Sequence, residues 1–194
     1  FAFDDTGQLL TSNSTVNADD ENFQYDANGN RLTSTGTGTV ITGPHNRLSS
    51  DATYNYEYDG EGNVIKRTAK VGGAYTKYDY DHRNRLTKVE SFTNANVAQW
   101  NVTYTYNAAD ELVSRTSVGT ANPGTEYYVS NDDARALAFD GGGILRHRYL
   151  WGQGQFLGED LHNATGQLIE YYWGASDHLG SVTDLVDMAN SAVV

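Results

Sequence analysis

One short phrase recurs along the chain and constrains its fold more than any other feature. The phrase is aromatic–x–aromatic–Asp, then a short stretch of Gly or Asn, then a polar and an aliphatic residue. Its clearest copy runs Phe23-Gln-Tyr25-Asp26-Ala-Asn-Gly29-Asn-Arg-Leu32. Full copies begin at Phe1, Phe23, Tyr56, Tyr78 and Tyr104. Degenerate copies, which keep only part of the phrase, lie at 43–48, 138–145 and 161–169. Self-similarity of this kind is the signature of a repeat architecture.

Each part of the phrase has a physical role in a β-hairpin. The two aromatic rings lie on one face of a strand, because side chains alternate between faces. Asp or Asn caps the turn, Gly or Asn supplies a positive φ angle, and the aliphatic residue packs back onto the rings. The expected turn residues are Asp4, Asp26, Gly29, Asp59, Gly62, Asp81, Asn107 and Asp177, and the expected packing aromatics are Tyr25, Tyr58, Tyr80 and Tyr106.

The spacing of the copies indicates how the hairpins are joined. A single hairpin is marginal in water, so neighbouring hairpins must pair side by side. The aliphatic residues that close successive copies are 16 to 33 residues apart, so the turn is fixed while the opposite loops vary. We therefore predict an all-β fold, in which antiparallel β-hairpins form one curved, winding sheet over residues 1–194. The best helix candidate is 131–137, which has helix-starting chemistry but is stopped by Phe139-Asp-Gly-Gly-Gly.

Composition excludes several classes of partner. The chain has 13 basic and 25 acidic residues and a net charge of −12, which disfavours nucleic acid and anionic membrane surfaces. It contains no cysteine, which excludes disulfides and thiolate metal sites. No apolar run approaches the ~18 residues of a membrane span, so no membrane insertion is expected. The first residues already read as a strand and turn, so we expect a fragment that begins inside a longer array.

Two copies of the phrase and one terminal motif carry a family resemblance. The segments 25–32 and 80–86 resemble the tyrosine–aspartate (YD) repeat of the RHS (rearrangement hotspot) family. Asp177-His-Leu-Gly-Ser181-Val is similar to the Asp-His-Leu-Gly-Ser motif of the RHS repeat-associated core. The resemblance covers essentially the whole chain. It implies a large β-shell that spirals from such hairpins.

The resemblance also implies a function. In bacterial polymorphic toxins and Tc-type toxin complexes the family's shell encloses a C-terminal toxin, and the similar teneurins of animals use it in cell adhesion. We therefore expect a non-enzymatic shell segment of a secreted or cell-surface bacterial protein. Its partners would be the rest of its own shell and an enclosed C-terminal effector, with self-association through free sheet edges. The alternative is an adhesion module that binds glycans or proteins.

Catalytic interpretations of the sequence are weaker than structural ones. The family's self-cleaving Asp-Pro-x-Gly-Leu motif does not occur here, so no catalytic residue is carried over. Asp177, His178 and Ser181 could suggest a catalytic triad, but so few consecutive residues cannot easily form the relay, and a capped turn explains them better. The remaining histidines have no zinc-site spacing; they are His45, His82, His147 and His162.

Binding sites for small ligands have structural alternatives too. Asp26-Ala-Asn28-Gly29-Asn30 is similar to the start of an EF-hand loop, but its Gly is misplaced and the bidentate Glu is missing. No cofactor is expected, although weak Ca²⁺ binding by loop acids at 19–21 or 132–133 is an alternative. Exposed aromatics could stack on glycans, with Trp100, Trp151 and Trp173 as candidates, whereas packing between hairpins is the favoured role of most rings.

Overall fold

The computed structural model describes residues 1–14, 20–34, 38–131, 134–152, 154–177, 181–187 and 193. Within these ranges the chain is almost entirely β-strand, and the helical part is one 3-10 turn, η2 (Pro44–Asn46). The chain divides into two compact units, Phe1–Gln99 and Trp100–Val194. No helix of the described residues is long and apolar enough to cross a bilayer.

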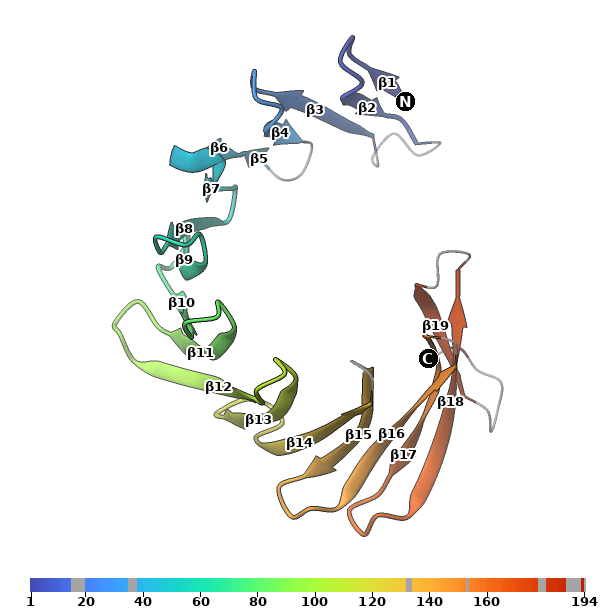
Figure 1. Ribbon diagram of the computed structural model, residues 1–194. Coiled ribbons are helices and arrows are strands. Elements are labelled where there is room, and N and C mark those ends of the chain that lie inside the picture. Colours follow the sequence, from blue (N-terminus) through green and yellow to red (C-terminus); the bar gives the residue numbers. More distant parts are fainter. Residues whose placement is uncertain are drawn as a thin grey trace. The chain divides into compact units, whose positions relative to one another are not determined.

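The first unit is a run of hairpins in chain order (Figure 1). One sheet has the strand order β1-β2-β3-β4-β5, and a second sheet continues from β6 to β11. Every pair is antiparallel. The strands are β1 (Ala2–Phe3), β2 (Leu9–Ser12), β3 (Glu21–Tyr25), β4 (Arg31–Ser34), β5 (Gly38–Thr39), β6 (Ile41–Thr42), β7 (Leu48–Ser50), β8 (Tyr54–Tyr58), β9 (Val64–Ala69), β10 (Tyr75–Tyr80) and β11 (Leu86–Phe92).

The second unit repeats this arrangement with longer strands. The strand order again follows the chain. Val186 of the last strand, β19, also forms an isolated antiparallel bridge with Val193. The strands are β12 (Ala98–Tyr106), β13 (Leu112–Val118), β14 (Gly124–Asn131), β15 (Ala134–Asp140), β16 (Leu145–Gly152), β17 (Gln155–His162), β18 (Leu168–Ser176) and β19 (Val182–Asp187). The predicted all-β array of antiparallel hairpins is confirmed.

Burial alternates along the strands as the repeated phrase predicts. In β8, Tyr54, Tyr56 and Tyr58 are half-buried, whereas Asn55 and Glu57 between them are exposed. The opposite face of this sheet carries paired charges, with Lys66 Nζ 2.8 Å from Glu57 Oε1 and Lys88 Nζ 2.8 Å from Glu90 Oε1. One tyrosine-rich face and one charged face are typical of an antiparallel sheet that is solvated on one side.

The described residues of the helix candidate at 131–137 are in β-strands. Asn131 ends β14, and Ala134 begins β15, while residues 132 and 133 lie outside the described part of the chain. Leu137 pairs with Val129, and Ala138 pairs with Tyr128. Cross-strand pairing with aromatic and β-branched neighbours therefore outweighs the local helix-starting chemistry.

Candidate functional site: the turn edge of the hairpins

The hairpins share one turn, here called the capped turn, which begins at the Asp of the phrase. At Asp26 the backbone N–H donates to the Asn30 carbonyl at 2.9 Å, and the Gly29 N–H donates back to the Asp26 carbonyl at 3.0 Å. Both bonds recur at Asp4, Asp59, Asp81, Thr93, Asn107, Asp140 and Asn163. At Asp177 the first bond is present, to the Ser181 carbonyl at 2.9 Å.

The side chain of the first residue caps this turn. Asp26 Oδ1 accepts hydrogen bonds from the N–H groups of Asn28 and Asn30, at 2.9 and 2.8 Å. Asp59 Oδ1 accepts from Gly62 and Asn63, both at 2.8 Å. The same oxygen caps the turns at Asp4, Asp81, Asn107, Asp140, Asn163 and Asp177. Each cap satisfies backbone donors that the tight turn leaves without a ladder partner.

The fourth residue of the capped turn has a left-handed backbone. Gly29 has a φ of 83° and Gly62 a φ of 101°, while Asn84 occupies the equivalent position with a φ of 60°. Next to the turn the strand register shifts, as between Glu57 and Tyr58. A left-handed residue together with a shifted register is the geometry of a three-residue hairpin loop with a bulge.

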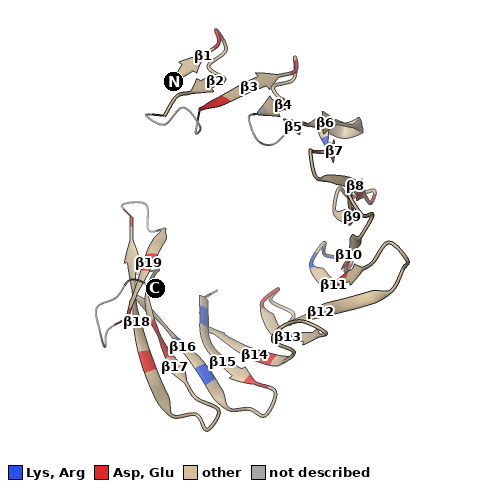
Figure 2. Cartoon of the chain, turned by 180° about the vertical axis from the view of Figure 1, so that it is seen from behind, with Lys and Arg blue, Asp and Glu red and all other residues tan. Residues whose placement is uncertain are grey.

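Hydrogen bonds to the caps keep their carboxylates charged. The Arg85 side chain, which donates from Nε to Asp81 Oδ2 at 2.8 Å, lowers the pKa of Asp81 to about 2, helped by the backbone N–H groups of the turn. At Asp26, hydrogen bonds from the side chain and backbone of Asn30 lower the pKa of the carboxyl in the same way. Asp26 and Asp81 are therefore ionised at neutral pH, and Figure 2 shows acidic residues at the tips of the first two hairpins.

A second repeated contact, here called the tyrosine bridge, joins some hairpins of the first unit to the one before them. Tyr25 Oη donates to the Leu9 carbonyl at 2.9 Å, and Tyr58 Oη donates to the Leu48 carbonyl at 2.7 Å. Tyr80 Oη donates to the Val64 carbonyl at 3.2 Å. In each case the tyrosine immediately precedes a turn, and the acceptor is the aliphatic residue that follows the preceding turn.

The strand pairing explains why these carbonyls accept a phenol. Between β2 and β3 the ladder consists of Thr11 with Asn22 and Ser12 with Glu21, so it stops before Leu9. Hairpins thus pair at the end away from the turns and separate near them. A carbonyl in this gap has lost its neighbouring N–H, and the phenol supplies the missing donor. Burial in the gap raises the pKa of Tyr58 and Tyr80.

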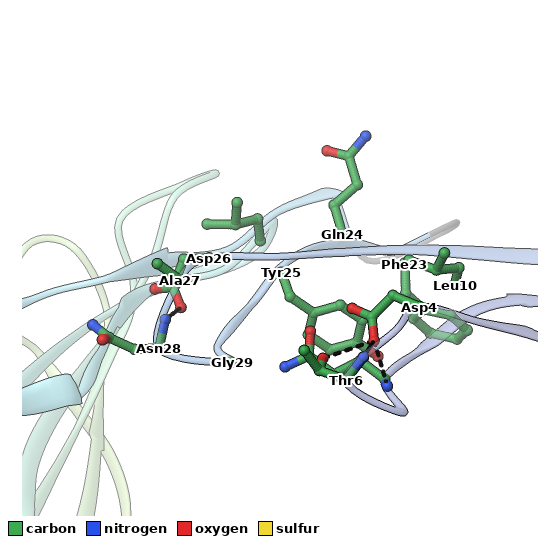
Figure 3. A pocket seen from close by; sticks show the side chains of 12 residues that line it. Asp4, Thr6, Leu10, Phe23, Gln24, Tyr25, Asp26, Ala27, Asn28 and Gly29 are labelled. Atoms are coloured by element: carbon green, nitrogen blue, oxygen red, sulfur yellow. Dashed lines mark hydrogen bonds between the residues drawn. The ribbon is translucent and has the colours of Figure 1, made fainter.

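The gap between the first two hairpins is a cavity of about 800 Å³ (Figure 3). In this view the ring of Tyr25 points toward the turn of Asp4 and Thr6, whereas the side chain of Gln24 points the opposite way. Direct turn-to-turn bonds close the outer side of later gaps. Asn30 Nδ2 donates to Asn46 Oδ1 at 2.6 Å. The same contact recurs between Asn63 Nδ2 and Asn84 Oδ1 at 3.0 Å.

In the second unit side chains of other types also donate to backbone carbonyls of nearby strands. Tyr106 precedes the turn of Asn107 and is half-buried. Trp151 Nε1 donates to the Arg135 carbonyl at 2.7 Å, and Arg146 Nε donates to the His162 carbonyl at 3.1 Å. The Arg146 contact joins the hairpin of Asp140 to that of Asn163, whereas the Trp151 contact joins β16 to β15 within the hairpin of Asp140.

Sequence reasoning missed one turn on the opposite edge. Thr93 Oγ1 accepts from the N–H groups of Ala95 and Val97, at 3.3 and 3.2 Å, and Asn96 has a φ of 63°. This capped turn replaces the irregular loop expected there. The available signal was Phe92-Thr93-x-x-Asn96, in which an aromatic, a capping residue and an Asn keep the spacing of the phrase.

The catalytic and metal candidates do not form a site in the described part of the chain. Ser181 and Asp177 are joined through the capped turn, while His178 lies outside the described residues, as do Asp19, Asp132 and Asp133. Among the described residues, no three His, Asp or Glu side chains come together as a metal site would require.

Comparison with known proteins places this repeated geometry in a family. The family model described as Teneurin YD-shell matches residues 1–153. The chain belongs to the YD-shell family. The predicted membership of the RHS/YD-repeat family is thereby confirmed. No curated protein gives a significant match to this YD-shell chain.

Solved structures similar to this YD-shell chain are distant and much longer. The crystal structure of TcdB2-TccC3-Cdc42 is 15% identical with a TM-score of 0.47, over 96% of this chain and 13% of that chain. The Photorhabdus luminescens Tc holotoxin pore is 14% identical with a TM-score of 0.28, over 100% of this chain and 15% of that chain. The YD-shell segment thus spans a small part of the length of these chains.

Proposed function

We propose that residues 1–194 are one structural, non-enzymatic segment of a β-shell in a secreted or cell-surface bacterial protein. The complete shell would enclose or present a C-terminal effector. The observation that carries this proposal is the tyrosine bridge, because it recurs with the same donor and acceptor positions at Tyr25, Tyr58 and Tyr80. Membership of the YD-shell family supports the same function.

The bridge makes the array extendable. At Tyr25, Tyr58 and Tyr80 a phenol before one turn reaches a carbonyl that follows the preceding turn. One contact rule can therefore join any number of hairpins, as in other repeat proteins whose units contact mainly their neighbours. The partners of this segment would then be further hairpins of its own shell and the material that the shell surrounds.

Enclosure is testable by protease protection. The whole gene product, including the residues that follow this segment, would be treated with a non-specific protease beside its C-terminal part expressed alone. We expect the C-terminal part to survive within the whole product at protease concentrations that degrade it alone. Equal degradation of the two samples would contradict an enclosing shell.

Self-processing is the enzymatic alternative, and intact mass decides it. Purified full-length product would be incubated for days and its mass measured at intervals. A structural shell segment keeps one mass throughout. A time-dependent cleavage within residues 1–194 would contradict the non-enzymatic role, whereas a cleavage elsewhere would leave it standing.

A further inference from the structure

A half-exposed aromatic row lies on β18 in the second unit. Tyr171 and Trp173 are two residues apart and therefore share one face of the strand. Both are 49% exposed. Within the described part of the chain, neither ring packs against another aromatic ring. Rings left open in this way, away from the tyrosine bridges, need a different explanation from packing between hairpins.

A buried ion pair stands beside this aromatic row. Arg148 on β16 pairs across to Asp160 on β17, and Asp160 pairs across to Tyr171 on β18, so the three side chains form one cross-strand line. Asp160 is fully buried, and its Oδ2 accepts hydrogen bonds from Nε and Nη2 of Arg148, the first at 2.6 Å. The Arg148 side chain is nevertheless 52% exposed. Asp160 thus fixes the guanidinium while part of it faces solvent.

Stability alone does not explain this pair. Burying a carboxylate costs more than its ion pair usually returns, and apolar replacements are often as stable. Asp160 Oδ1 is also buried and receives no hydrogen bond from any described residue. A costly, incompletely satisfied charge that orients a half-exposed arginine is typical of a binding site.

A glycine is the cross-strand partner of Trp173. Gly158 on β17 is directly opposite Trp173. A Cβ atom at Gly158 would lie 2.3 Å from the Tyr172 carbonyl oxygen, so no side chain can stand there. β17 therefore carries no side chain directly opposite Trp173, and the backbones of β17 and β18 pack closely there.

We propose that Tyr171, Trp173 and Arg148 form a binding site for a neutral oligosaccharide. A sugar ring presents an apolar C–H face, which stacks on an aromatic ring, and hydroxyls, which accept hydrogen bonds from a guanidinium. Strand geometry separates Arg148 from Tyr171 by about 10 Å and Tyr171 from Trp173 by about 7 Å. Those separations suit a short oligosaccharide and define a surface far smaller than the ~800 Å² that each partner of a stable protein interface buries.

Charge favours a neutral ligand over an anionic one. Asp184 is exposed on β19 opposite Ala175, two residues beyond Trp173, and the chain carries a net charge of −12. A sulfated or carboxylated sugar would be repelled on that side. The aromatic row lies beyond residues 1–153, which the family model matches, and the proposal goes beyond the shell function.

The test uses the complete 194-residue chain and four named probes. Cellohexaose, chitohexaose and mannohexaose are the neutral probes, and a heparin hexasaccharide is the anionic one. Saturation-transfer NMR and titration of tryptophan fluorescence report binding. We expect at least one neutral probe to bind and the heparin fragment not to bind. Failure of all neutral probes, or binding of the heparin fragment alone, would overturn the proposal.

Matched variants locate the site. Trp173→Ala and Tyr171→Ala should each weaken binding by about tenfold or more, as expected for loss of one stacking ring. Tyr127→Ala on β14 removes an aromatic side chain that is 48% exposed and should leave affinity unchanged. Arg148→Gln, which keeps hydrogen-bond donors but removes the charge, should weaken binding while the stacking shift of the fluorescence persists. Undiminished binding by folded Trp173→Ala would refute this location.

A labelled chain covers the case in which Trp173→Ala does not fold. With 5-fluorotryptophan incorporated, the ¹⁹F signal of Trp173, assigned through Trp173→Phe, should shift on addition of the neutral probe. The signals of Trp100 and Trp151 should remain in place. A shift confined to those other tryptophans would contradict the proposed site.

Discussion

At the residue scale, the phenol that precedes a capped turn and the carboxylate that opens it have separate tasks. The phenol of Tyr58 binds the preceding hairpin, at the Leu48 carbonyl. The carboxylate of Asp59 binds its own turn, at the N–H groups of Gly62 and Asn63. The tyrosine–aspartate pair therefore couples the formation of one turn to the attachment of that turn to its neighbour.

Removing one phenolic oxygen should weaken that attachment. Tyr58→Phe keeps the ring but leaves the Leu48 carbonyl without its donor, so we expect a loss of about 1 kcal/mol in the free energy of unfolding. Tyr54→Phe is the matched control, because the Tyr54 ring lies 4.4 Å from the Arg67 guanidinium and its interaction there does not depend on the hydroxyl. Urea denaturation measures both, and equal stabilities of the two variants would contradict the bridge.

Acid should weaken the turns through their caps. The pKa of Asp81 is lowered from 3.8 to about 2 in the folded chain, so folding favours the charged form. This contribution is complete above the unfolded value and is lost as the pH falls from about 4 through about 2. We expect the thermal midpoint of unfolding to fall as the pH is lowered over that range. In Asp81→Asn the midpoint should fall less over the same range. An unchanged slope in Asp81→Asn would contradict this role of the cap.

At the element scale, the hairpins were predictable where a short phrase encodes them. The turn needs a capping residue and a left-handed residue at fixed spacing, and Asp59 with Gly62 meets both conditions locally. Pairing between hairpins is not local. The strand at Ala134–Asp140 forms because Leu137 and Ala138 find partners on β14, which helix-starting residues at 131–133 do not reveal. For the same reason the sequence does not predict that Arg148, Asp160 and Tyr171 lie side by side, because they come from three separate strands.

Two glycines in one turn provide a matched test of the turn geometry. Gly62 has a φ of 101°, and an added Cβ would lie 3.1 Å from the Arg47 guanidinium. Gly62→Ala should therefore cost about 1–2 kcal/mol, the penalty for a left-handed non-glycine residue. Gly60 has no atom within 4 Å of an added Cβ, and Gly60→Ala should change stability by less than about 0.5 kcal/mol. Thermal or urea unfolding would measure both, and similar losses would contradict the assignment.

At the scale of the whole molecule, stability comes from contacts between neighbours rather than from one deep core. The hydrophobic side chains that are buried in the described residues are Val102, Tyr128 and Ala138. Each hairpin is covered mainly by the next one along the chain. Strands at the ends of such a series keep unpaired backbone groups on their outer sides.

We predict that the isolated chain associates through these outer strands. Phe1 and Phe3 are 85% and 60% exposed at the first strand, which favours pairing with another copy. Light scattering should show a mass that rises with concentration, and Phe3→Lys should reduce it, because a charge on an edge strand opposes pairing. Phe3→Leu is the apolar control. A monomer at all concentrations would contradict this prediction.

The tyrosine bridge also gives the array a direction. Every donor lies later in the chain than its acceptor: Tyr25 reaches back to Leu9, and Tyr80 reaches back to Val64. During synthesis the acceptor hairpin therefore exists before its donor leaves the ribosome. Each new hairpin can dock on a finished one at short sequence separation, so ordered growth from the N-terminus needs no distant segment. A gene that gains or loses a whole hairpin preserves this junction, which lets such arrays change length during evolution without redesigning their contacts.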